Sequence, residues 1–67
     1  MNLDEYLFRH KISKTEFAKL IGVSRTYIHD IIARRRTPRP PLAKKIEEAT
    51  RGKVTRNELL FPEDYQS

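Results

Sequence analysis

Apolar residues recur at helical spacing in two neighbouring segments of the chain. Each segment has them at positions i, i+3 and i+4, which are Phe17, Leu20 and Ile21 in the first and Ile28, Ile31 and Ile32 in the second. This spacing puts each trio on one face of an α-helix. The pattern therefore predicts two short amphipathic helices, one over about 14–21 and one from 24 to about 33 or 34.

The three residues between these segments, Gly22-Val23-Ser24, have the chemistry of a tight turn. Gly22 can take the left-handed conformation that ends a helix, and Ser24 can cap the next helix. Val23 is expected to be a buried linker. Such a joint sets the second helix at a steep angle to the first, so that its outer face can enter a groove. We therefore predict a helix-turn-helix unit of the DNA-binding type at 14–33.

The N-terminal segment has the signals of a further helix. Asn2 can cap it, and its buried stripe consists of Leu3, Tyr6 and Leu7. It is expected to end near His10-Lys11, with Ile12 packed beneath the junction. Ser13-Lys14-Thr15-Glu16 is a capping-box sequence, which fixes the start of the next helix.

The C-terminal half begins with a basic, proline-rich loop at 34–41. Its prolines disfavour helix before them, and Pro40 or Pro41 suits the first turn of a fourth helix that ends near Gly52. Thr55-Arg56-Asn57-Glu58 is a second capping-box sequence, and it predicts a short fifth helix that Phe61-Pro62 closes.

The composition limits both the fold and the function. The 67 residues, 37% of them apolar, suffice for one small domain with a single compact core. Together with the five helices predicted above, this gives one all-α domain over 1–67, with a frayed tail at 63–67. The chain has no cysteine and no apolar run of membrane-spanning length, which fits a cytoplasmic protein. Neither histidine has neighbours that complete a metal or nucleophile site, and both glycines are isolated. We therefore expect no enzyme activity, metal, cofactor or small-molecule ligand.

Positive charge is concentrated in one part of the chain. The formal net charge is +5, yet residues 1–33 hold five Lys/Arg against four Asp/Glu. Residues 34–56 hold nine Lys/Arg against two glutamates, and the last eleven residues are acidic. The excess charge therefore starts where the second helix of the helix-turn-helix unit ends, which is where a phosphate backbone would lie if that helix entered a groove.

The chain resembles the phage Cro/CI-repressor-like (XRE) helix-turn-helix family. The residues that carry the resemblance are Phe17-Ala18, Gly22-Val23-Ser24, Ile28 and Ile31. The segment 46–63, IEEATRGKVTRNELLFPE, is similar to the end of short Cro-like regulators of the YdaS-like branch. Many members have Glu at the position of Ile32 and Gly or Asn just beyond it, where this chain has Ala33-Arg34-Arg35. The resemblance implies a lambda-repressor-like domain of phage or bacterial origin that binds operator DNA as a homodimer and acts as a repressor.

Candidate base-reading residues lie on the polar side of the helix at 24–34. In the family's docking geometry the candidates are Ser24, Arg25, Thr26, His29 and Asp30. Arg25 can donate two hydrogen bonds to guanine, Thr26 can contact thymine or a phosphate, and Asp30 can accept from cytosine or orient Arg25. The alternatives are that Arg25 and Thr26 are ordinary solvated side chains and that Asp30 pairs with Arg34 at i, i+4.

Candidate phosphate contacts flank that helix on both sides. They are Lys14, Tyr27, Arg34, Arg35, Arg36 and Arg39. Lys14 lies at a helix N-terminus, where the helix dipole also favours an anion. A run of arginines is usually a solvated surface, but this one directly follows the predicted recognition helix. For Tyr27 the alternative is half-buried packing on the stem of Arg34.

A second class of function is a protein-interaction module, such as an antitoxin or anti-regulator. Its surface would be the apolar C-terminal set Val54, Leu59, Leu60, Phe61 and Tyr65. The same set can equally be core or a homodimer seam. Membrane binding is disfavoured because the basic cluster is in a loop, and RNA binding lacks an interleaved aromatic platform.

Overall fold

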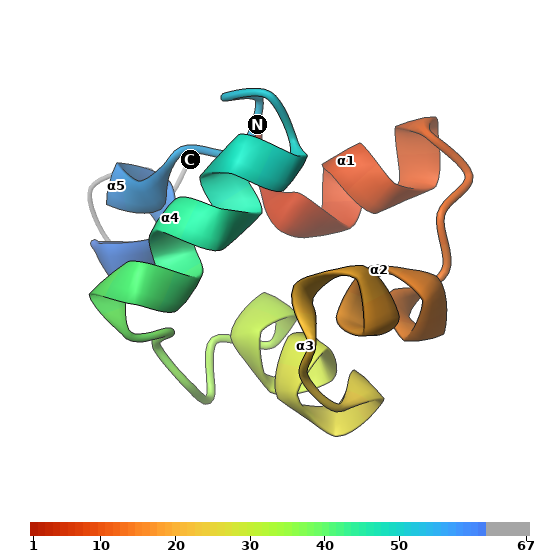
Figure 1. Cartoon of the computed structure of the whole chain (residues 1–67), viewed down its shortest axis with the longest axis horizontal. Coiled ribbons are helices and arrows are strands. Elements are labelled where there is room, and N and C mark those ends of the chain that lie inside the picture. The colour runs from red at the N-terminus through yellow and green to blue at the C-terminus, as the bar shows by residue number, and fades with distance from the viewer. Residues whose placement is uncertain (62–67) are drawn as a thin grey trace.

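Five α-helices make up the described part of the chain, residues 1–61 of this computed structural model (Figure 1). The helices are α1 (Leu3–Arg9), α2 (Lys14–Ile21), α3 (Arg25–Ile32), α4 (Pro40–Ala49) and α5 (Arg56–Leu60). No strand occurs in this range, so the predicted all-α class is confirmed. The tail predicted to fray, with Tyr65, lies outside the described residues. No helix in the described range is long and apolar enough to cross a membrane.

Local capping interactions set the start of four helices. A side-chain oxygen accepts a backbone N–H three residues further on in each case, from Asn2, Ser13, Ser24 and Thr55. In α2 and α5 the third-position glutamate also accepts the N–H of the cap residue, so both predicted capping boxes are present. Arg39 precedes α4 without a side-chain cap, and Pro40 begins that helix instead, since its fixed φ suits a first turn.

The capping box of α2 makes stability depend on pH. The Ser13 backbone N–H donates to the Glu16 carboxylate at 3.1 Å. This bond, followed by the one to the Ser13 side chain, lowers the pKa of Glu16 from its ordinary value of 4.5. A lowered pKa means that the folded state favours the carboxylate. The bonds to the Glu16 carboxylate therefore stabilise the folded state above pH 4.5. This stabilisation is lost as the pH falls through the lowered pKa of Glu16.

We therefore expect Glu16→Gln to lower the melting temperature at neutral pH and to have a smaller effect in acid. Thermal unfolding followed by circular dichroism over a pH series measures the difference between variant and wild type. Glu48→Gln is the control, because within residues 1–61 the Glu48 side chain makes no hydrogen bond or ion pair. A difference between Glu16→Gln and wild type that stays constant down to low pH would contradict this account.

The core draws on all five helices, and it corrects one prediction for α2. The least exposed large side chains include Phe17, Ile21 and Ile28, at 2% or less. Leu20, predicted to be buried with Phe17 and Ile21, is 63% exposed, and Ala18 is buried in its place. At about 100° per residue the buried arc runs from Phe17 past Ile21 to Ala18, and Leu20 lies beyond its other edge. The helices that pack against α2 therefore contact the side of α2 that carries Ala18.

The turn between α2 and α3 has the predicted form. Gly22 has φ +90°, in the left-handed region, and the N–H groups of Gly22 and Val23 both donate to the Ala18 carbonyl at 2.7 and 2.9 Å. A Cβ on Gly22 would meet only the Lys45 Nζ, at 3.8 Å. Glycine is therefore required by the backbone angle and not by lack of space. Val23 is half-buried against the core, less deeply than predicted.

A buried threonine fixes α5 to the end of α4. The Thr50 side chain is 1% exposed, and its hydroxyl donates to the Ile46 carbonyl at 3.0 Å and accepts the Val54 N–H at 3.1 Å. A buried hydroxyl with both roles filled avoids the cost of an unpaired polar group. The helix α4 ends at Ala49, earlier than the predicted stop at Gly52, because Thr50 is its cap and Arg51 already has φ +54°, followed by Gly52 with φ +79°.

Candidate nucleic-acid interface

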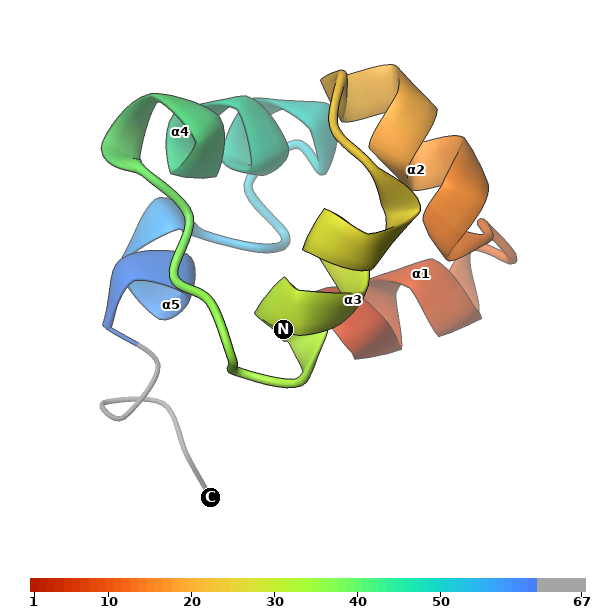
Figure 2. The same cartoon turned by 90° about the horizontal axis from the view of Figure 1, so that it is seen from below.

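α3 and the loop that follows it lie on the same side of the molecule, which is the near side in Figure 2. The inner face of α3 is anchored by Ile28 and Ile31, which are 0% and 8% exposed. Its outer face presents the predicted base-reading set: Ser24, Arg25, Thr26 and His29 are exposed and Asp30 is half-buried. The Ser24 hydroxyl oxygen caps the helix by accepting the Tyr27 N–H at 3.0 Å. Four of the five predicted residues are thus open to solvent, and Thr26, His29 and Asp30 lie opposite the buried isoleucines at about 100° per residue.

The end of α3 comes slightly earlier than predicted. The helix stops at Ile32, Ala33 is its cap, and Arg34 has φ +63° in the left-handed region. The Arg35 N–H then donates to the Asp30 carbonyl at 2.8 Å. An arginine therefore takes the conformation that Gly or Asn adopts most easily. The first residues of the loop are hydrogen-bonded back onto α3.

The loop arginines are free of acidic partners within residues 1–61. Arg34, Arg35, Arg36 and Arg39 are all exposed. The ion pairs in the described range join other residues, namely Met1 with Glu58, Arg9 with Glu5 and Arg56 with Glu47. The alternative interpretation of Asp30 as the partner of Arg34 therefore finds no ion pair in this part of the chain. No carboxylate within residues 1–61 therefore forms an ion pair with these guanidinium groups.

Tyr27 holds one of these arginines beside α3. The Arg36 guanidinium carbon lies 5.1 Å from the centre of the Tyr27 ring, and the ring is half-buried. Tyr27 therefore packs as the alternative interpretation expected, but on Arg36 and not on the stem of Arg34. A cation–π contact of this kind contributes about 0.5–1 kcal/mol at an exposed site.

Lys14 extends the same surface from the other helix of the unit. It is half-buried at the start of α2, and its Nζ lies 3.5 Å from Nδ1 of His29 in the middle of α3. The contact joins a candidate phosphate ligand to a candidate base-reading residue. Sequence reasoning proposed both residues but missed their contact, since nothing local relates positions 14 and 29.

The chain matches the helix-turn-helix family model over residues 5–56, which is more than half of its length. It belongs to the Cro/CI-type (XRE) helix-turn-helix family. XRE domains are DNA-binding regulatory domains that bind double-stranded DNA, and they are not an enzyme family. The searches of curated proteins and of solved structures return no significant match. Placement in the short YdaS-like branch stays a prediction.

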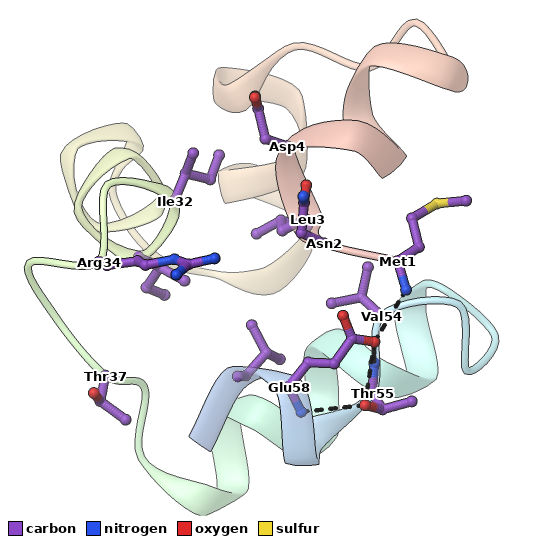
Figure 3. A pocket seen from close by; sticks show the side chains of 12 residues that line it. Met1, Asn2, Leu3, Asp4, Ile32, Arg34, Thr37, Val54, Thr55 and Glu58 are labelled. Carbon is purple, nitrogen blue, oxygen red and sulfur yellow. Dashed lines mark hydrogen bonds and ion pairs between the residues drawn. The ribbon is translucent and has the colours of Figure 1, made fainter. Parts of the chain in front are cut away.

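Arg34 is the loop arginine of this XRE domain that lines a hollow beside α1. Figure 3 shows the Arg34 side chain reaching toward Asn2 and Leu3, into a hollow of about 660 Å³ between α1, the end of α3 and α5. The hollow is also lined by acidic Asp4 and Glu58, and the latter accepts from the Met1 amino group at 3.2 Å.

The apolar C-terminal set of this XRE domain is mainly core. Val54 and Leu59 are 0% and 8% exposed, and Leu60 is half-buried. Phe61 is exposed, and Tyr65 lies outside the described residues. The proposed protein-interaction surface thus loses its central members, because they close the domain's own core. Arg56, at the start of α5, pairs with Glu47 at 3.3 Å.

Proposed function

We propose that the protein is a sequence-specific repressor that binds operator DNA in the cytoplasm of a bacterial or phage-infected cell. α3 would lie in the major groove, and the loop after it would lie along the phosphate backbone. The observation that carries the proposal is the exposed polar face of α3, bordered by arginines that have no ion-pair partner within residues 1–61. Membership of the XRE family supports double-stranded DNA as the ligand.

The base-reading role falls to side chains near the N-terminus of α3. Arg25 would donate two hydrogen bonds to guanine O6 and N7, and Thr26 would contact the neighbouring base pair or a phosphate. Asp30 would accept from cytosine N4. Ser24 is the least suited to reading a base, because its oxygen already caps the helix. In this assignment the outer face of α3 supplies sequence preference.

The phosphate role falls to cations on either side of α3. They are Lys14, Arg35, Arg36 and Arg39, with the hydroxyl of Tyr27 beside Arg36. Arg34 is left out because its side chain lines the hollow between α1, the end of α3 and α5. Phosphate contacts fix the orientation of a protein on the duplex without reading its sequence.

We further propose that two copies bind a palindromic operator. A single module of this size covers little DNA surface, and two-fold symmetry doubles the contacts. In the helix-turn-helix geometry the half-sites would be about 34 Å apart, which is one turn of the duplex. Selection from random double-stranded DNA tests ligand, sequence and symmetry together, and a palindromic consensus is the expected result. Recovery of no preferred sequence would overturn the proposal.

Arg25→Ala is expected to abolish preference at one base pair of each half-site. The loss should be about 1–3 kcal/mol for the selected sequence, because a bidentate guanine contact disappears. Binding to duplexes already mutated at that base pair should change little. Fluorescence anisotropy with a set of single-base variants measures both. Arg9→Ala on α1, where Arg9 pairs with Glu5, is the matched control and should leave the preference unchanged. Equal weakening on all duplexes would remove Arg25 from the reading set.

A further inference from the structure

The contact between Lys14 and His29 constrains what His29 can offer to DNA. The Lys14 Nζ lies 3.5 Å from Nδ1 of the ring. A lysine ammonium can only donate hydrogen bonds, so Nδ1 must be the acceptor. In a neutral imidazole whose Nδ1 accepts, the hydrogen is on Nε2. The other side of the His29 ring is then a hydrogen-bond donor.

The positions of the two residues support a shared role. Lys14 is on the same stripe of α2 as Phe17 and Ile21 and is half-buried, so its stem is held against the body of the domain. The Ser13 cap fixes the backbone beside it. His29 is exposed on the outer face of α3, one turn after Arg25. A restrained cation therefore meets a ring that is open to solvent.

We propose that Lys14 and His29 act as one recognition unit, an inference that rests on the proposed DNA-binding function. Lys14 is a positioning residue: it donates to Nδ1 and leaves Nε2–H of His29 to donate to a purine N7 in the major groove. The two remaining N–H donors of Lys14 bind an adjacent phosphate. One ammonium thus couples a backbone contact to a base contact. N7 is an acceptor on both purines, so the unit reads which strand carries the purine.

The free protein provides the first test, independent of DNA. Nitrogen-15 NMR of the histidine rings, at a pH where titration shows them to be neutral, reports which nitrogen is protonated or hydrogen-bonded. Lys14→Met keeps the apolar stem and removes the donor. It should shift the His29 ring nitrogens and leave those of His10, which stacks on Tyr6 with ring centres 4.2 Å apart, unchanged. Unchanged His29 nitrogens would overturn the inference.

DNA binding provides the second test, with the duplex obtained by selection. Replacing each purine in turn by its 7-deaza analogue removes one N7 acceptor. At one position the replacement should weaken wild-type binding by at least about fivefold and leave His29→Ala binding unaffected. The Lys14→Met, His29→Ala double variant should lose clearly less than the product of the two single losses, by about threefold or more.

The outcomes separate this inference from the proposed function. If the wild type selects a sequence but no 7-deaza position distinguishes it from His29→Ala, the recognition unit is wrong and the DNA-binding proposal stands. The same holds if the losses of the two single variants simply multiply. If the wild type selects no sequence at all, the proposed function itself fails.

Discussion

Ile28→Ala is expected to destabilise the protein by about 2–5 kcal/mol. The Ile28 side chain is fully buried and anchors α3 to the core. Its truncation removes buried apolar surface and leaves a cavity that close-packed neighbours fill only in part. A domain of this length has a free energy of unfolding of about 3–10 kcal/mol in total. The substitution should therefore remove a large share of the total stability and lower the urea concentration at the unfolding midpoint.

Urea denaturation followed by circular dichroism measures this loss, and Leu20→Ala is its matched control. Leu20 is an aliphatic residue of the same size in the same helix-turn-helix unit, but it is 63% exposed. Its truncation should change the free energy of unfolding by less than about 0.5 kcal/mol. If both variants lost similar stability, the packing of α2 described here would be wrong.

Arg35→Ala combined with Arg36→Ala is expected to have the largest effect on DNA binding. If each arginine contacts one phosphate, the slope of log affinity against log salt should decrease in magnitude by about 1.8. Affinity at low salt should fall by a similar factor for the selected operator and for unrelated duplexes, because phosphate contacts are independent of sequence. Anisotropy titrations over a range of salt concentrations give both quantities.

Arg56→Ala controls for the loss of a positive charge as such. Arg56 is exposed like the loop arginines, but it is held by Glu47 at 3.3 Å near the α4–α5 junction. Its removal should leave the salt slope within error of the wild type. A double variant at 35 and 36 with an unchanged slope would show that the loop does not bind the backbone.

The positions of the helices could be predicted because they depend on local signals. Each cap is a bond between residues three positions apart, and the left-handed turn at Gly22 follows from one residue type. The exposure of Leu20 could not be predicted in the same way. The i, i+3, i+4 rule shows that Phe17, Leu20 and Ile21 share a face, but it does not show on which side of that face the neighbouring helices pack.

The sequence predicts which residues form the polar face of α3, but it does not predict the contacts that these residues make. The polar face of α3 follows from helical periodicity once Ile28 and Ile31 are placed inside. The pairs that organise this face, Lys14 with His29 and Tyr27 with Arg36, depend on how α2 crosses α3 and on how the loop turns. The position of Arg34 at the hollow beside α1 also depends on contacts between distant parts of the chain, which local sequence does not give.

The bonds between α3 and the first half of its loop have a consequence for how a new operator preference can arise. The Arg35 N–H is bonded to the Asp30 carbonyl, and the Arg36 guanidinium lies over the Tyr27 ring, so both arginines are held to α3 by residues of that helix. A substitution at Tyr27 would remove the contact that holds Arg36 beside α3. It would therefore change the proposed phosphate contact of Arg36 together with the surface of α3. Sequence preference can therefore evolve independently at Arg25 and Thr26, but not at Tyr27.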